Sequence, residues 1–152
     1  MGFIFSKVLN LLSVPKYYKI LMLGLDFSGK STILNKIKQK ESVRILPAIG
    51  LHIESLFYMG LLEIISWDLG GASRMRELFK VFYPNTDGII LVIDSNDKER
   101  FDDAIECFQY ILEEKELKNC PILIMANKQD MSELLSLDEI TLFLKNEKYN
   151  DR

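Results

Sequence analysis

The sequence has few of the residues on which several large protein classes depend. It contains two cysteines, Cys107 and Cys120, and one histidine, His52. Two cysteines cannot make a disulfide framework, so we expect both side chains to be buried thiols. One histidine excludes zinc sites and Ser-His machinery that are built from several histidines.

Clustered positive charge is also missing. The net charge is −3, and no tract of Lys and Arg interrupts the chain. A nucleic-acid-binding surface must neutralise phosphates with clustered Lys and Arg, so we expect no nucleic-acid partner. No apolar run approaches the length of a membrane-spanning helix, and the sequence shows no repeats. What remains is a chain of 152 residues, 48% of them hydrophobic, which suits one globular domain with a sizeable core.

The strongest pattern that is present runs from Gly24 to Ser31 and reads Gly-Leu-Asp-Phe-Ser-Gly-Lys-Ser. It matches the phosphate-binding loop G-x-x-x-x-G-K-[ST], and it lies between a strand-like run and a helical run, as that loop requires. Gly24 and Gly29 would permit the turn and the close approach of phosphate, and successive backbone N–H groups would point at its oxygens. Lys30 is expected to reach the β- and γ-phosphates, and the Ser31 hydroxyl to bind Mg²⁺ directly. The predicted nucleotide-binding residues here are Gly24, Leu25, Asp26, Phe27, Ser28, Gly29, Lys30, Ser31 and Thr32.

The beginning of the chain fits a lipid anchor. Gly2 fits the N-myristoylation pattern, and residues 3–14 have the spacing of an amphipathic helix. One myristoyl chain binds membranes only weakly, so the helix would supply a second hydrophobic element. A signal peptide is disfavoured because a charged n-region and a small-residue cleavage site are missing, whereas a helix packed permanently on the domain remains an alternative. We therefore predict an anchoring helix at 1–15 and a single domain at 16–152.

A second pattern, Asp68-Leu69-Gly70-Gly71, follows a strand-like run at 61–67. A carboxylate in this place can hold Mg²⁺ through water, and a glycine N–H can meet the terminal phosphate. Asp68 and Gly71 are the candidates for these two roles. D-x-x-G alone is more often a turn, and it indicates a nucleotide site here only because it follows the phosphate-binding loop at a plausible distance.

A third pattern, Asn127-Lys128-Gln129-Asp130, follows a buried strand-like run. The Asp130 carboxylate can accept hydrogen bonds from the ring N–H and the amine of guanine, whereas adenine presents an acceptor there. Asn127 would bridge base and phosphate loop, and the Lys128 stem would cover the flat face of the base. A polar loop after a strand is common, but its place after the first two patterns favours a guanine nucleotide.

Hydrophobic periodicity predicts strands that alternate with helices, which is typical of a three-layer α/β sandwich with ligand loops at the carboxyl ends of a mostly parallel sheet. A short connection at residues 59–60 predicts an antiparallel hairpin, and residues 39–47 are expected to form a loop. The predicted strands cover 18–23, 51–58, 61–67, 88–94 and 121–126, and the predicted helices cover 31–37, 73–83, 97–117 and 136–144.

These patterns together resemble the ADP-ribosylation factor and Arf-like family of small GTPases over nearly the whole chain. The resemblance implies a P-loop fold with an N-terminal amphipathic helix that is released as GTP binds, while the hairpin at 51–67 shifts register. It implies GTP or GDP with Mg²⁺ as cofactors, and exchange factors, GTPase-activating proteins and effectors as partners. It also implies a cytoplasmic protein, peripheral on an organelle membrane such as the Golgi or another endomembrane, that acts in vesicle traffic. The segments that carry the resemblance are Gly2 with 3–14, Gly24–Ser31, Pro47 with Ile49 and Gly50, Trp67–Gly71, Asn85–Gly88, Val92–Ser95 and Ala126–Asp130.

Three residues depart from the family pattern. Ala48 replaces a threonine in the first switch, so it can still donate its N–H to a phosphate but has no hydroxyl for Mg²⁺. Ala72 replaces a glutamine, and a methyl group cannot orient the attacking water. Phe27 is bulkier than the usual residue and would obstruct a partner or pack on a switch. We therefore expect very slow hydrolysis and assign no catalytic residue.

The length also departs from the family, which continues with a further strand, a second guanine-contacting loop and a final helix where this sequence ends at Arg152. If the chain ends naturally there, residues 122–125 would form an apolar sheet edge; a truncated sequence, a partial gene model and a divergent short isoform all fit.

Three functions stay open: a GTP-binding switch with little GTPase activity, a nucleotide-free pseudo-GTPase that serves as an interaction module, and a P-loop ATPase or nucleotide kinase. Asp130 and the lack of an arginine-rich lid disfavour the third.

Overall fold

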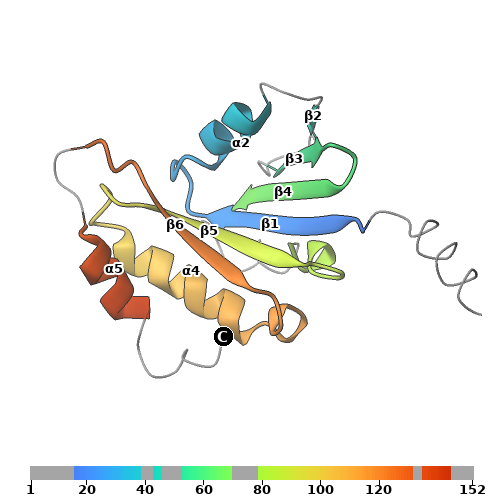
Figure 1. The fold of residues 1–152 in the computed structure, drawn as a ribbon. Helices are drawn as coiled ribbons and strands as arrows, with labels where there is room; N and C mark the ends of the chain where they lie inside the picture. The colour runs from blue at the N-terminus through green and yellow to red at the C-terminus, as the bar shows by residue number, and fades with distance from the viewer. Residues whose placement is uncertain (1–15, 39–42, 46–52, 70–78, 132–134, 145–152) are drawn as a thin grey trace, which may run out of the picture.

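The computed structural model describes residues 16–38, 43–45, 53–69, 79–131 and 135–144 (Figure 1). The predicted anchor with Gly2, and the switch positions Ala48, Gly71 and Ala72, lie outside the described residues. The helices are α2 (Lys30–Lys38), α4 (Phe101–Glu113) and α5 (Leu137–Leu144), with two 3-10 turns, η1 (Lys80–Phe82) and η2 (Lys115–Leu117). The strands are β1 (Tyr18–Gly24), β2 (Val43–Ile45), β3 (Ile53–Tyr58), β4 (Leu62–Asp68), β5 (Gly88–Asp94) and β6 (Ile122–Asn127).

All six strands form one sheet in the order β2-β3-β4-β1-β5-β6. The strands β4, β1, β5 and β6 pair in parallel, and β3 runs antiparallel to both of its neighbours. This confirms the predicted mostly parallel sheet with one antiparallel strand. In register, Gly24 is level with Asp68, and Asp94 is level with Asn127. The residues at which the motifs begin therefore lie at the carboxyl edge of the sheet, where open α/β sheets bind ligands.

The central strands bury both faces, which explains their continuous apolar sequence. Successive side chains of a strand point to opposite faces. Accordingly Leu21 and Leu23 of β1 belong to a core shared with α4 and α5, whereas Met22 belongs to a second core with Leu34 of α2. Figure 1 shows the same arrangement, with α2 on one face of the sheet and α4 and α5 on the other. The three-layer α/β sandwich is thus confirmed.

Two predicted elements differ from the structure. The segment 39–47, expected to be a loop, contains β2, whose residue Val43 is level with Leu56 of β3. A strand of three residues is too short to show alternation. The helix expected at 97–117 is shorter: it begins at Phe101 as α4 and gives way to η2 after Glu113. Asp97 accepts the Arg100 N–H and so holds the preceding turn.

Other predicted bounds agree within a residue or two. The strand predicted at 88–94 is β5, whose bounds are the same. Of the helix predicted at 73–83, only its end is described, and it contains η1. In the part of the chain that the structure describes, no helix has the length and hydrophobicity of a membrane span.

Candidate nucleotide-binding site

An open cleft of about 640 Å³ lies at the carboxyl edge of the sheet. Its lining comes from the phosphate-binding loop and the first residues of α2, from Glu54 in β3, from Ser66 and Asp68 in β4, and from Lys128 after β6. Clefts of roughly 300–1,000 Å³ are typical of small-molecule and cofactor sites. The cleft therefore has room for a nucleotide, and segments far apart in the sequence form its walls.

The glycines of the phosphate-binding loop are required by the space around them. A Cβ on Gly24 would lie 2.3 Å from the carbonyl oxygen of Val92, and a Cβ on Gly29 would lie 2.2 Å from Nδ2 of Asn127. Gly29 also has a φ of +98°, in the region that favours glycine. The first turn of α2 follows directly, since the Ile33 N–H donates to the Gly29 carbonyl at 3.0 Å. The loop thus packs closely against β5 and Asn127 and continues directly into the N-terminus of α2. Backbone N–H groups at a helix N-terminus form an anion-binding arrangement.

Lys30 joins this loop to the end of β4. Its Nζ donates to the carbonyl oxygens of Gly24 at 3.0 Å and Leu25 at 2.6 Å, and lies 2.7 Å from Oδ1 of Asp68. The side chain is 4% exposed. Burial lowers the pKa of Lys30, and the hydrogen bond and charge of Asp68 oppose that shift. The three N–H groups of this ammonium are already taken up by these acceptors, so a phosphate oxygen that binds Lys30 would replace one of them.

Glu54 is a site residue that no sequence pattern predicts. Its Oε1 accepts a hydrogen bond from Ser31 Oγ at 2.8 Å, and its Oε2 is buried without a hydrogen-bond partner. Its only signal in the sequence is a carboxylate within the hairpin, and no pattern links it to the loop. An oxygen without a partner beside a serine hydroxyl suits Mg²⁺, which prefers oxygen ligands and is usually held by one or two carboxylates together with phosphates and waters. Ser31, Glu54 and Asp68 thus fit this metal.

The described residues contain no group of three or more His, Cys, Asp or Glu side chains that would hold a metal ion. Three carboxylates line the cleft, those of Asp26, Glu54 and Asp68, and two of them are paired, Asp26 with Arg100 and Asp68 with Lys30. A cation in this cleft would therefore need oxygens from a bound phosphate to complete its coordination.

The loop after β6 is tied to the phosphate-binding loop. Asn127 Nδ2 donates to the Ser28 carbonyl oxygen at 2.8 Å, and Lys128 Nζ lies 2.6 Å from Oδ2 of Asp94. Lys128 has a φ of +62°, in the left-handed region that few residues other than glycine adopt, and its side chain lines the cleft. Asp130 is exposed and is not among the residues that line the cleft. The structure thus brings Asn127 and Lys128 to the site and leaves Asp130 at its margin.

Phe27 stands at the opening of the cleft. Its side chain is 80% exposed, and its φ is +61°. A bulky residue in this conformation is uncommon and carries backbone strain. The ring is thus an apolar projection beside the phosphate-binding residues, and its expected effect on a partner or a switch stays a prediction.

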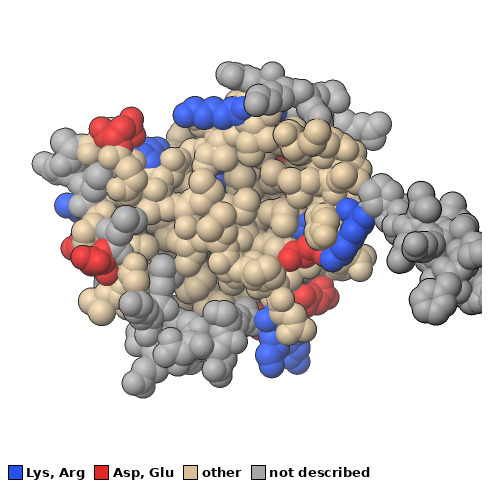
Figure 2. Space-filling view, in the orientation of Figure 1, with Lys and Arg blue, Asp and Glu red and all other residues tan. Residues whose placement is uncertain are grey.

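The described charged side chains on the face shown in Figure 2 are not sorted by sign. On the face in Figure 2, the described Lys and Arg side chains lie in separate places, several of them beside Asp or Glu. Ion pairs among the described residues include Lys16 with Asp87, Lys80 with Glu114, and Arg100 with Asp97.

A strand, a glycine-bordered loop and a helix N-terminus, with a buried lysine and a second polar loop against them, define the P-loop class of nucleotide-binding proteins. Within that class, the chain matches the model of the ADP-ribosylation factor family over residues 5–152. The chain belongs to this family. The family consists of GTP-binding switches of membrane traffic that work with exchange factors, GTPase-activating proteins and effectors at endomembranes.

Proposed function

We propose that this chain is a membrane-associated guanine-nucleotide switch that binds GTP and GDP with Mg²⁺ and hydrolyses GTP slowly. The observation that supports this most is the meeting of three segments in one cleft: the phosphate-binding loop, the end of β4 with Asp68, and the loop after β6 with Asn127 and Lys128. Binding of a nucleotide explains why a buried lysine, a serine hydroxyl and a carboxylate converge there.

Each residue has a defined part in this proposal. Backbone N–H groups of the loop and of the first turn of α2 bind the phosphates, and Lys30 adds its charge. Ser31 would ligate Mg²⁺ directly, Asp68 would hold it through water, and Glu54 would supply a further oxygen nearby. When bound, Mg²⁺ neutralises charge on the phosphates. Lys128 covers the base, and Asp130 selects guanine by accepting from its ring N–H and amine.

Slow hydrolysis follows from two side chains. Ala72 has no group that can orient an attacking water, and Ala48 offers Mg²⁺ no hydroxyl. The protein would therefore remain in a GTP state for longer than a relative with Gln and Thr at these positions. Phe27 adds to this effect if its exposed ring hinders an activating partner at the phosphates.

The membrane part of the proposal rests on the sequence. Gly2 would carry the myristoyl group, and residues 1–15 would form the amphipathic anchor on the cytoplasmic side of the Golgi or another endomembrane. Exchange factors, GTPase-activating proteins and effectors would be its partners, as in the rest of the family.

The test is the identity of the nucleotide. The full chain is purified in Mg²⁺, heat-extracted and analysed by chromatography, and we expect GDP or GTP in near-stoichiometric amount. Recovery of neither, together with no uptake of added GTP, would support a nucleotide-free pseudo-GTPase that acts as an interaction module. A preference for ATP would contradict the assignment of guanine.

Asp130→Asn tests the base directly. An amide at this position can donate to the second carbonyl of xanthine, which replaces the guanine amine, so the variant should exchange a preference for GDP for one for xanthosine diphosphate. Asp138→Asn, which changes another exposed carboxylate, in the first turn of α5, is the matched control. Unchanged preference for GDP in Asp130→Asn would remove Asp130 from the site.

A further inference from the structure

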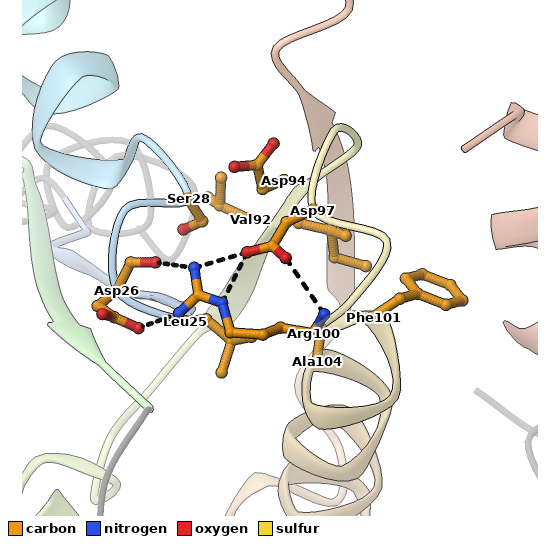
Figure 3. Close-up of a pocket in the computed structure, with 10 residues that line it drawn as sticks. Leu25, Asp26, Ser28, Val92, Asp94, Asp97, Arg100, Phe101 and Ala104 are labelled. Carbon is orange, nitrogen blue, oxygen red and sulfur yellow. Dashed lines mark hydrogen bonds and ion pairs between the residues drawn. The ribbon is translucent and has the colours of Figure 1, made fainter. Parts of the chain in front are cut away.

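Arg100 lies between two carboxylates (Figure 3). Its Nη1 is 2.7 Å from Oδ1 of Asp26, and its Nη2 is 2.6 Å from Oδ2 of Asp97. Nε also donates to Asp97 Oδ2 at 2.7 Å, and the Arg100 backbone N–H donates to Asp97 Oδ1 at 3.2 Å. Arg100 immediately precedes α4, whereas Asp26 belongs to the phosphate-binding loop. One guanidinium therefore connects this loop to the turn between β5 and α4.

Asp26 places a carboxylate within the phosphate-binding loop. It lines the nucleotide cleft, and it also lines a small cavity beneath the loop that Arg100 borders. The side chain is 45% exposed, so it is partly solvated on the cleft side. A bound polyphosphate would bring several negative charges close to this carboxylate, and like charges within a few ångströms repel each other. The loop needs a compensating positive charge besides Lys30, which is paired with Asp68.

The planar guanidinium group of Arg100 lies where it can supply that charge. Asp97 holds Nε and Nη2 on one side of the guanidinium, which leaves Nη1 directed at Asp26. Arg100 Nη2 also approaches the Asp26 carbonyl oxygen at 3.5 Å. The hydrogen bond to Asp97, and after it that to Asp26, raises the pKa of Arg100, which stays charged throughout the working pH range. A lysine has no such planar fork and could not hold both carboxylates in this geometry.

The same turn contacts the loop after β6. Asp94 pairs with Lys128 at 2.6 Å, Gln129 Nε2 donates to Ser95 Oγ at 2.6 Å, and the Ser95 N–H donates to the Asn127 carbonyl at 3.1 Å. Ser95 is fully buried. The segment 94–100 therefore holds the predicted base loop at one end and the phosphate-binding loop at the other.

We infer that Arg100 is a positioning residue of the nucleotide site, which neutralises Asp26 toward the phosphates and fixes the phosphate-binding loop to the segment 94–100. This inference rests on the proposed binding of guanine nucleotides. The role differs from a purely structural one because the contribution of Arg100 to nucleotide affinity depends on the negative charge of the ligand and on the charge of Asp26.

The experiment measures dissociation constants for GMP, GDP and GTP with the full chain in Mg²⁺. We expect Arg100→Gln to weaken GDP binding by about three- to tenfold at low salt, with a larger loss for GTP, a smaller loss for GMP and a smaller effect at high salt. The matched control is Lys80→Gln, which removes the same charge from the Lys80–Glu114 pair (3.2 Å) on another part of the surface. Arg100→Lys should restore part of the affinity, because it keeps the charge without the fork.

Asp26→Asn completes a double-mutant cycle. As a single variant, Asp26→Asn should slow GDP release, because the positive charge of Arg100 is then no longer compensated by Asp26. This measurement does not need Arg100→Gln, so it still tests the inference if that variant fails to fold. In the Asp26→Asn background, Arg100→Gln should cost clearly less affinity than in the wild type. Equal losses in both backgrounds, or equal losses for GMP and GTP, would overturn the inference in favour of a structural tie.

Two further outcomes separate the inference from the proposed function. If the wild type binds GDP and GTP, and Arg100→Gln behaves like Lys80→Gln, only the inference fails. If the wild type binds no guanine nucleotide, both fail.

Discussion

The Nζ atom of Lys30 lies 2.7 Å from Oδ1 of Asp68, with the lysine side chain 4% exposed and the aspartate side chain 32% exposed. The ion pair joins the start of α2 to the end of β4 across the floor of the cleft. Because desolvation disfavours a buried ammonium, the charge of Lys30 is maintained by this carboxylate and by the two backbone carbonyls that it contacts.

Lys30→Met should strongly weaken nucleotide binding without unfolding the protein. A charged hydrogen bond to phosphate is lost, so affinity for GDP should fall by about a hundredfold or more. Asp68 loses its partner but is partly exposed and can be hydrated. Isothermal titration and thermal unfolding would measure both effects, with Lys36→Met on the exposed side of α2 as control. Wild-type affinity in Lys30→Met would contradict the site.

Glu54→Gln should weaken the effect of Mg²⁺ on nucleotide retention. The variant keeps an acceptor for Ser31 but removes the charge of a carboxylate whose second oxygen is buried and unpaired. Release of labelled GDP in Mg²⁺ should accelerate by about tenfold toward the rate in EDTA, as for other residues that support a metal ligand. Glu63→Gln, whose carboxylate accepts from Tyr17, serves as the control. An unchanged ratio between the two rates would exclude Glu54 from the metal environment.

Ala72→Gln combined with Ala48→Thr should raise single-turnover hydrolysis of GTP. The amide would orient the attacking water and the hydroxyl would ligate Mg²⁺, and better positioning is expected to increase the rate by about tenfold or more. Ala72→Leu, which adds a similar volume without hydrogen-bonding groups, should leave the rate low. Rapid hydrolysis by the unmodified chain would refute this prediction.

Gly2→Ala should release the protein from membranes. Without the myristoyl chain, the segment 1–15 retains only its apolar face, and one hydrophobic element gives reversible binding. The measurement is recovery with vesicles after co-expression with an N-myristoyltransferase, and Ser13→Ala is a control outside the lipidation pattern. Equal recovery of Gly2→Ala and the wild type would count against the lipid anchor.

The start of α5 should make stability depend on pH in the acid range. Glu139 Oε2 accepts from the Ser136 N–H at 2.7 Å and from Ser136 Oγ at 2.8 Å, while the Glu139 N–H donates to Ser136 Oγ at 3.1 Å. The Ser136 N–H lowers the pKa of Glu139, so the stabilisation is present above about pH 5 and is lost as the pH falls through the lowered pKa.

Urea unfolding between neutral and acid pH tests this capping box. Glu139→Gln should reduce the dependence on pH, and Ser136→Ala should cost about 1 kcal/mol at neutral pH, as for other N-caps. An identical pH profile for Glu139→Gln and the wild type would show that the box contributes nothing to global stability.

Local pattern was sufficient for much of the fold. A buried parallel strand such as β5 is apolar throughout and flanked by polar turns, so its limits could be predicted. The phosphate-binding loop is recognisable because its constraints lie within a few consecutive residues. The parallel sheet then brings the ends of its strands together at one edge.

The residues that could not be predicted depend on distant partners. Glu54 matters because its strand passes beside Ser31, and Arg100 matters because α4 begins against Asp26. Neither residue belongs to a periodic pattern or a motif, and the residues adjacent in sequence would predict only a solvent-exposed side chain at each position. The strand β2 was missed for a different reason, since its pairing with β3 depends on the hairpin rather than on its own three residues.

The close approach of Asn127 to Gly29 has a consequence for how this sequence can vary. An alanine at Gly29 would place its methyl group 2.2 Å from the Asn127 amide, and that amide holds the Ser28 carbonyl. Any side chain at position 29 would therefore displace the Asn127 amide and weaken the bond that joins the two loops, and the φ of +98° would strain it whatever residue stands at position 127. A substitution at either position thus acts on the same contact between the phosphate-binding loop and the loop after β6.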